Sequence, residues 1–217
     1  MKNCSINIIK RQFFTYRQPY FNKLPKFYNN FQSKMTLITI SQSLDESYTK
    51  HKVVPEVIDQ FDTQGLLSIE FKENHMVSLG NLLSVEATQS VPKIQLTLNS
   101  PTQDGKIESI DKDDKFILVM TDPDAPSASD HKWSEYLHWL VTDLKLNHDQ
   151  NNNQDISHFI LAKDGNELVE YNGPAPPPKT GKHRYVFLLY KQDPNVKDLK
   201  APKDRPNWGT GIPSSGC

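Results

Sequence analysis

The chain has 217 residues and a formal net charge of -1, and 36% of its residues are hydrophobic, 10% aromatic and 24% charged. This composition is typical of a globular protein with enough apolar residues to form a core. No apolar run approaches the roughly 18 residues that a membrane-spanning helix requires. The length favours one domain with appended segments.

The charges are unevenly distributed along the chain. Residues 1–44 contain seven basic residues and no acidic residue, so the remaining residues hold all 26 acidic and the other 18 basic residues, a net charge of -8. An acidic body argues against nucleic-acid binding. The two cysteines, Cys4 and Cys217, lie near opposite ends of the chain and suggest neither a disulfide framework nor a cysteine metal site, as expected in a reducing compartment.

The N-terminal extension, residues 1–34, is basic, rich in asparagine and crowded with aromatic residues. The absence of acidic residues fits a mitochondrial presequence, although such segments are usually richer in Arg and Ser. An alternative interpretation is that translation starts at Met35 and that the extension is an untranslated leader. The sequence leaves both open, and we expect a single domain over residues 35–217.

The predicted elements after the extension are one helix and a series of short strands. Ile40, Leu44 and Tyr48 recur every fourth position, which predicts a helix, and Pro55 can open a short turn over residues 55–58. Apolar runs rich in β-branched and aromatic residues predict strands. In chain order they cover residues 66–71, 76–79, 94–98, 116–120, 133–144, 157–161, 168–171 and 184–191.

The connections between these strands complete the predicted fold. The polar segments 103–115 and 147–155 are interpreted as exposed loops, and residues 193–217 have no regular periodicity. The turn residues Lys163–Asn166 predict a hairpin between the two strands that flank them. Short strands with one N-terminal helical segment predict an antiparallel β-sandwich.

Two stretches have a rigid polar turn at one end of a predicted strand. One is Thr121–Pro126, which follows the apolar run 116–120, and the other is Gly173–Pro178, which leads through Lys179–Arg184 into the strongest predicted strand. An Asp-Pro turn alone is most often only a loop. Because His183 and Arg184 directly precede a buried strand, we expect the two stretches to meet at one edge of the sheet.

His138 differs from the other histidines in its surroundings. We expect Tyr136, His138 and Leu140 on one face of a strand, with Leu137, Trp139 and Val141 on the other. His138 and His183 then have the same two interpretations, a core histidine with one hydrogen bond or a member of a site with Asp122 or Asp124. The remaining histidines lie in or beside polar segments and are expected to be solvated: His51, His75, His131, His148 and His158.

Two histidines and a carboxylate at one strand end would form a small anion pocket. As a metal triad, Asp122, His138 and His183 lack any supporting spacing, so we expect no metal and no cofactor. No nucleophile is paired with a base in a recognisable motif, so the sequence does not indicate an enzyme.

These motifs resemble those of a known family. Asp122–Pro126, His138 and Gly181-x-His183-Arg184-Tyr185 resemble the signatures of the phosphatidylethanolamine-binding proteins. Residues 119–133, 171–192 and 203–209 (KDRPNWG) are similar, within that family, to its inhibitors of serine carboxypeptidases. The resemblance begins near Met35 and extends almost to the end of the chain.

The resemblance implies an all-β fold, a Greek-key antiparallel β-sandwich with short peripheral helices. It also implies a cis peptide bond before Pro126, which costs little at proline. Family members continue beyond the Trp208 region through a helix and a final strand, so the resemblance implies that residues 35–217 lack these elements. The implied pocket for an anion or phospholipid headgroup would be lined by Asp122, Trp133, Tyr136, His138, Gly173, Ala175, Pro176, His183 and Tyr185.

The function that the resemblance implies is non-enzymatic inhibition of a serine carboxypeptidase, with binding of a phospholipid headgroup or phosphate and of a Ras GTPase-activating protein as further expectations. The implied inhibitory segment consists of Thr36, Leu37, Ile38, Thr39 and Ile40. Such a protein would be cytoplasmic, or vacuolar with its target. Two alternatives remain: a signalling regulator that binds a Ras GTPase-activating protein or kinase, and a structural subunit of a mitochondrial assembly if residues 1–34 are a presequence.

Overall fold

A computed structural model describes residues 42–61, 63–98, 110–111, 113–146 and 157–208 of the chain. The inhibitory segment 36–40, the extension 1–34, most of the predicted loop 103–115 and the residues after Trp208 lie outside the described residues. Residues 42–50 form the predicted helix, and the predicted turn at 55–58 is confirmed, with Val57 N and Ile58 N donating to Val53 O at 2.9 and 3.1 Å.

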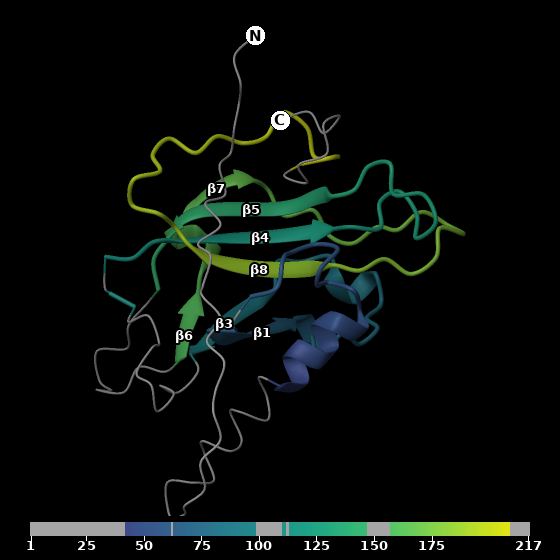
Figure 1. Ribbon diagram of the computed structural model, residues 1–217, viewed down its shortest axis with the longest axis horizontal. Helices are drawn as coiled ribbons and strands as arrows, with labels where there is room; N and C mark the ends of the chain where they lie inside the picture. Colours follow the sequence, from purple (N-terminus) through teal and green to yellow (C-terminus); the bar gives the residue numbers. More distant parts are fainter. Residues whose placement is uncertain (1–41, 62, 99–109, 112, 147–156, 209–217) are drawn as a thin grey trace, which may run out of the picture.

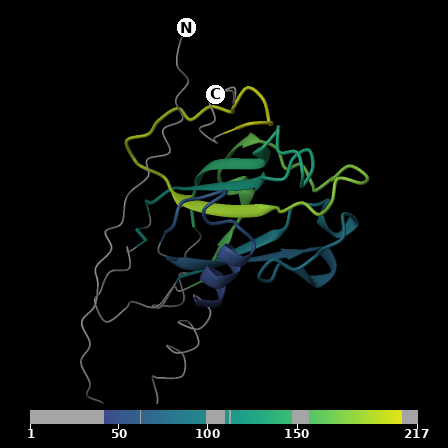
Figure 2. The same ribbon diagram turned by 45° about the vertical axis from the view of Figure 1, so that its right-hand side comes forward.

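Two four-stranded antiparallel sheets lie one above the other (Figure 1; turned in Figure 2). The first sheet has the order β2-β1-β3-β6, and its strands are β1 (Gly65–Phe71), β2 (His75–Met76), β3 (Lys93–Leu98) and β6 (Ser157–Ile160). The second has the order β7-β5-β4-β8, formed by β4 (Phe116–Asp122), β5 (Tyr136–Leu144), β7 (Asn166–Val169) and β8 (Val186–Lys191). Three short 3-10 helices accompany them: η1 (Lys72–Asn74), η2 (Glu86–Thr88) and η3 (Ala162–Asp164). The predicted antiparallel sandwich is confirmed.

The main core lies between the sheets. Leu118 and Met120 of β4 are fully buried, and Phe71 of the first sheet packs edge-on against Phe187 of the second, with ring centroids 6.5 Å apart. A second cluster covers the outer face of β4 and β5, where Trp208 packs with Val119. Since β4 is covered on both faces, its continuous apolar run is explained.

Three expectations about the strands are wrong. The predicted hairpin does not form, because β6 pairs with β3 in the first sheet while β7 pairs with β5 in the second. The turn itself exists, as η3, but it carries the chain from one sheet to the other. A local turn signal cannot show whether the flanking strands pair with each other or with more distant strands.

The predicted strand 76–79 is limited to β2, which ends at Met76. Leu79 has a φ of 46° and Gly80 a φ of 80°, and this left-handed backbone cannot continue a strand. Ser78 and Asn81 instead close a turn, with Asn81 N donating to Ser78 O at 2.9 Å.

The expected alternation along β5 is also wrong, because a β-bulge interrupts it. Met120 pairs with Trp139 but Thr121 pairs with Leu137, so His138 is the additional residue. Leu137 therefore packs in the outer cluster, whereas Trp139 packs between the sheets. His158, expected to be solvated, is 1% exposed because β6 lies in the first sheet.

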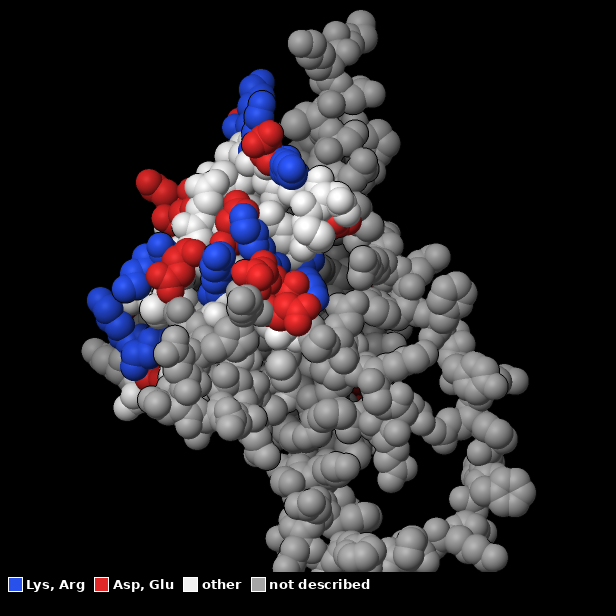
Figure 3. Space-filling view, turned by 90° about the vertical axis from the view of Figure 1, so that its left-hand side faces the viewer, with Lys and Arg blue, Asp and Glu red and all other residues white. Residues whose placement is uncertain are grey.

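The face of the molecule in Figure 3 mixes positive and negative side chains rather than gathering one sign. Where β4 begins and β8 ends, Lys115 Nζ lies 2.6 Å from Asp143 Oδ1, and Lys191 Nζ lies 2.8 Å from Asp114 Oδ2. This face therefore has no charged patch for a polyanion among the residues drawn in colour. Within the described ranges, no helix has the length and apolarity needed to span a membrane.

Candidate functional site

The site lies where β4 ends and where β5 and β8 begin. These three ends lie side by side because the strands are neighbours and antiparallel, and their loops extend together at the right of Figure 1. Ala128 N donates to Thr180 O at 3.0 Å and ties the loop after β4 to the loop before β8. The two polar stretches singled out in the sequence therefore do meet.

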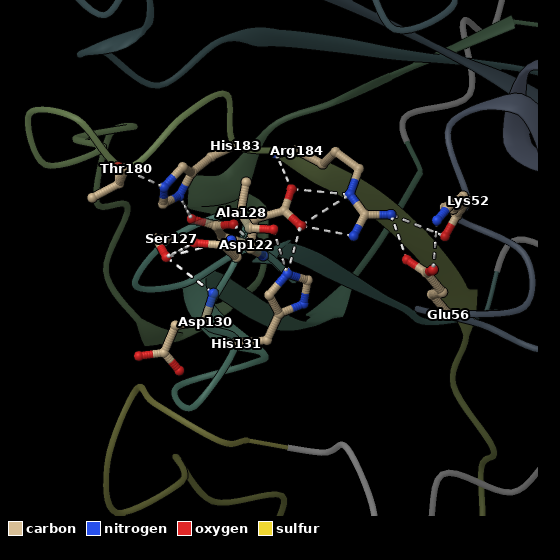
Figure 4. Close-up of polar contacts among 12 residues, drawn as sticks. Lys52, Glu56, Asp122, Ser127, Ala128, Asp130, His131, Thr180, His183 and Arg184 are labelled. Carbon is tan, nitrogen blue, oxygen red and sulfur yellow. Dashed lines mark hydrogen bonds and ion pairs between the residues drawn. The ribbon is translucent and has the colours of Figure 1, made fainter.

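Asp122 and His183 form the buried centre of the site (Figure 4). His183 Nδ1 lies 2.8 Å from Asp122 Oδ2, and the two side chains are 2% and 4% exposed. The other oxygen of Asp122 accepts a hydrogen bond from Asp124 N at 2.8 Å. Burial raises the pKa of Asp122, an effect that the hydrogen bond and the charge of His183 partly offset.

Thr180 extends this pair but is not arranged as a nucleophile. Its Oγ1 lies 3.0 Å from His183 Nε2, so hydroxyl, imidazole and carboxylate follow the order used in acyl transfer. The hydroxyl proton, however, is directed to Pro177 O at 2.7 Å. Thr180 Oγ1 therefore accepts from His183 Nε2–H, and the imidazole does not withdraw its proton.

Both ring nitrogens of His183 thus have protein partners. Nδ1 faces the carboxylate of Asp122, and Nε2–H donates to Thr180 Oγ1. These two contacts fix the ring of His183 against Asp122.

Asp124 forms a second pair, with Arg184. Its Oδ2 accepts from the backbone N of Arg184 at 2.7 Å and from Nε at 2.9 Å, and its Oδ1 accepts from Nη2 at 2.7 Å. Burial opposes ionisation of Asp124, but the hydrogen bonds from Arg184 outweigh it and hold the pKa of Asp124 below its usual value. The sequence motif contains both residues, but sequence reasoning did not predict that they pair.

His138 lies beside this centre. Its Nδ1 is 2.6 Å from Asn172 O, a backbone carbonyl, rather than from Asp122 or Asp124, the partners considered in the sequence. Because a carbonyl can only accept, Nδ1 carries the proton and Nε2 of the neutral ring is an acceptor. Burial lowers the pKa of His138, which favours this neutral form.

Aromatic rings enclose His138 on two sides. Its ring centroid lies 5.1 Å from that of Tyr136 and 5.1 Å from that of Tyr185. Burial and, to a smaller extent, the charge of Asp122 raise the pKa of Tyr185. The hydroxyl of Tyr185 is also hydrogen-bonded to the backbone of Ala175. Asp122, Tyr136, His138, Ala175, His183 and Tyr185 are therefore brought together.

The remaining predicted residues lie around this cluster. Gly173 is buried, and a Cβ there would lie 2.9 Å from Gln89 Oε1, so the glycine permits the close approach of the loop to η2. Pro176 is half-buried in the same loop. Trp133 is 44% exposed, and Lys132 Nζ lies 5.5 Å from the centroid of its ring.

Glu135 was not anticipated from the sequence. Its Oε2 accepts from Thr121 Oγ1 at 2.8 Å, and Thr121 in turn accepts from Trp208 Nε1 at 3.1 Å. Burial raises the pKa of Glu135 to about 7. The expected cis bond between Ala125 and Pro126 is present, and the Val54–Pro55 and Ser134–Glu135 bonds are also cis.

In the described part of the chain, no group of three or more His, Cys, Asp or Glu residues could hold a metal ion. A family model described as phosphatidylethanolamine-binding protein matches residues 59–211. The chain belongs to this family.

Similar members of the phosphatidylethanolamine-binding protein family come from yeast and plants. The carboxypeptidase Y inhibitor of Saccharomyces cerevisiae is 43% identical over 82% of this chain and 88% of its own length. Protein MOTHER of FT and TFL1 homolog 2 of Oryza sativa subsp. japonica is 34% identical over 73% of this chain and 77% of its own.

Solved structures of the phosphatidylethanolamine-binding protein family support the same fold. The crystal structure of carboxypeptidase Y inhibitor complexed with the cognate proteinase covers 84% of this chain and 88% of the inhibitor chain, with a TM-score of 0.70 and 43% identity. The phosphatidylethanolamine-binding protein of Plasmodium vivax has a TM-score of 0.50 and 28% identity, covering 66% of this chain and 68% of its own.

Proposed function

We propose that this protein inhibits a serine carboxypeptidase and is not an enzyme. The observation that supports this most is the 43% identity to a carboxypeptidase inhibitor along most of both chains, together with a TM-score of 0.70 to that inhibitor in complex with its proteinase. The geometry of Thr180 agrees with a non-enzymatic role, since its hydroxyl is not activated by His183.

The segment proposed to enter the peptidase active site is Thr36–Ile40. It is short, apolar and uncharged, and it directly precedes the helix over residues 42–50. The active site of a carboxypeptidase accepts a chain end in a blind pocket. The basic and aromatic residues 1–34 would then prevent entry sterically, whatever their own affinity.

The test compares inhibition constants of two forms, one starting at Met35 and the full 217-residue chain, against a purified serine carboxypeptidase. The shorter form keeps every residue that the structure describes. We expect it to inhibit strongly and the full chain to inhibit poorly or not at all. Equal constants would place the contact elsewhere on the protein, and absence of inhibition by both forms would refute the proposal.

We also propose that the site holds a phosphate or a phosphorylated headgroup weakly. Several observations support this: the carboxylate of Asp122 is hydrogen-bonded to His183, His138 Nε2 becomes a donor when the ring is protonated, and Ala175 and Tyr185 lie beside it. Protonated His138 and a shielded Asp122 can together accommodate an anion.

Inorganic phosphate and phosphoethanolamine are suitable probes for calorimetric titration. His183→Ala removes the ring whose hydrogen bond shields the carboxyl of Asp122, so we expect phosphate binding to weaken by about 1.5–3 kcal/mol, the range for a hydrogen bond to a charged group. His75→Gln, on the first sheet, is the matched control and should bind as the unchanged protein does. Equal affinities of the His183→Ala variant and the parent would remove His183 from the site.

A further inference from the structure

Arg184 connects the site to the helix over residues 42–50. Arg184 lies in the loop just before β8, and in Figure 4 its guanidinium points toward Lys52 and Glu56, which follow that helix in the chain. Its Nη1 donates to His51 O at 3.0 Å, to Lys52 O at 3.1 Å and to Glu56 Oε2 at 2.9 Å. One side chain therefore bridges two segments that are more than 120 residues apart in the chain.

The helix end that receives Arg184 has a defined geometry. Lys52 has a φ of 55°, Lys52 N donates to Thr49 O and Val53 N donates to Tyr48 O at 2.8 Å. This is the Schellman arrangement, with lysine at the left-handed position where glycine is usual. The carbonyls of His51 and Lys52 remain available, and a cation there is favoured by the helix dipole.

The helix also contacts loop residues. Among residues 42–50 only Leu44 is buried. Ser47 Oγ donates to Leu79 O at 3.0 Å, and the Tyr48 ring lies 5.8 Å from that of Phe61. The hydrogen bonds of Arg184 add to these contacts at the C-terminal end of the helix.

Arg184 is held rigidly for this task. Asp124 binds two nitrogens of its guanidinium, and the backbone N of Asp124 is in turn held by Asp122. The side chain is 23% exposed, and its guanidinium is engaged by Asp124, His51 and Glu56. The planar guanidinium can bind a carboxylate on one edge and the helix end on the other, which a lysine cannot do.

We propose that Arg184 is a positioning residue that fixes the helix over residues 42–50 to the site end of the second sheet. On the proposed function, on which this inference rests, the inhibitory segment Thr36–Ile40 directly precedes that helix in the sequence. The position of the helix therefore sets the point on the protein from which the segment extends toward the peptidase. Glu56 assists by accepting from the same Nη1.

The experiment measures two quantities on four variants. Amide hydrogen exchange is followed in the full 217-residue chain, and the inhibition constant is measured for the form starting at Met35. The variants are Arg184→Gln, Arg184→Lys, Glu56→Gln and the control Lys191→Gln, which removes an ion pair at the other end of β8. Glu56→Gln leaves the pair with Asp124 intact, so it tests the helix contact if Arg184→Gln fails to fold.

In Arg184→Gln we expect exchange of the amides of residues 47–53 to accelerate about tenfold or more while β4 and β5 keep their protection. The inhibition constant should rise by about tenfold, with a smaller rise for Arg184→Lys. Glu56→Gln should change both quantities by up to about fivefold, the range for an exposed ion pair. Lys191→Gln should change neither.

Unchanged exchange at residues 47–53 in both Arg184→Gln and Glu56→Gln would overturn the inference. Equal acceleration across both sheets would also overturn it, since Arg184 would then act on overall stability. A loosened helix with an unchanged inhibition constant would separate Arg184 from inhibition. If the parent does not inhibit at all, the proposed function fails, and hydrogen exchange alone decides whether Arg184 positions the helix.

Discussion

Asp122, Asp124 and Glu135 are three carboxyl groups at one end of the second sheet, and their surroundings give them different pKa values. Asp124 is buried but receives several hydrogen bonds from Arg184, which lower its pKa. Asp122 has one hydrogen bond with His183 and one from a backbone N–H. Here the effect of burial is the larger one, so the pKa of Asp122 is raised. Glu135 has one hydroxyl donor, and burial raises its pKa to about 7. The ionisation of each group therefore depends on its donors as well as on its burial.

Glu135→Gln should change how stability depends on pH. In the unfolded chain the carboxyl loses its proton near its ordinary pKa of 4.5, whereas in the folded chain it keeps the proton to about 7. Between pH 4.5 and about pH 7 the folded state therefore binds more protons than the unfolded state. The free energy of unfolding falls as the pH rises through this range, by up to about 3 kcal/mol. The amide cannot ionise but can still accept from Thr121, so the variant should lose this decline.

The measurement is the free energy of unfolding by urea between pH 4 and pH 8.5. Glu170→Gln replaces an exposed carboxyl and serves as the control. We expect the Glu135→Gln curve to lie above the parent curve at pH 8 and to approach it at pH 4. Parallel curves for Glu135→Gln and the parent would show that Glu135 ionises at a similar pH in both states.

At the level of elements, the loop 173–178 is held against η2 through Gln89. Gln89 Nε2 donates to Val85 O and to Pro174 O, both at 2.8 Å. A Cβ on Gly173 would lie 2.9 Å from Gln89 Oε1 and 3.1 Å from Gln89 Cα, so the Gln89 amide would have to move and the backbone to shift by a few tenths of an ångström. Asn172, directly before this loop, supplies its carbonyl oxygen to His138.

Gly173→Ala should therefore destabilise the protein by about 1–3 kcal/mol, the usual cost of overpacking. It should also weaken phosphate binding, since Asn172 would shift relative to His138. The decisive measurement is a double-mutant cycle with Gln89→Ala, which removes the nearest clashing atoms. We expect the double variant to lose less stability than the two single losses combined. Additive losses would mean that the contact with Gln89 is not the cause.

The short strands could be predicted from the sequence because alternation, apolar runs and turn residues are local signals. Which strands pair could not, because pairing depends on distant segments, as the separation of β6 from β7 shows. The bulge at His138 likewise arises from the register between β4 and β5. One inserted residue was enough to place Leu137 on the opposite face from the one expected.

The site was predictable to the extent that its residues lie in short motifs. Asp122 and His183 belong to two such motifs, and the structure joins them by a hydrogen bond. The partner of His138 is a backbone carbonyl, which leaves no trace in the sequence. The role of Arg184 at the helix end and the burial of Glu135 both depend on contacts that only the assembled fold provides.

Over the whole molecule, each sheet is completed by a strand from late in the chain. β6 pairs with β3, with Ile160 opposite Ile94, and β8 pairs with β4, with Lys191 opposite Phe116. Pairings of such long sequence separation form slowly, because the intervening chain must first be ordered. Arg184 lies two residues before β8, so it can meet the helix end only after β8 has docked. The helix over residues 42–50 leaves the ribosome before either sheet, yet it is among the last elements to be fixed in place. On the proposed function, an unfinished chain would therefore carry the inhibitory segment without yet being able to present it to a peptidase.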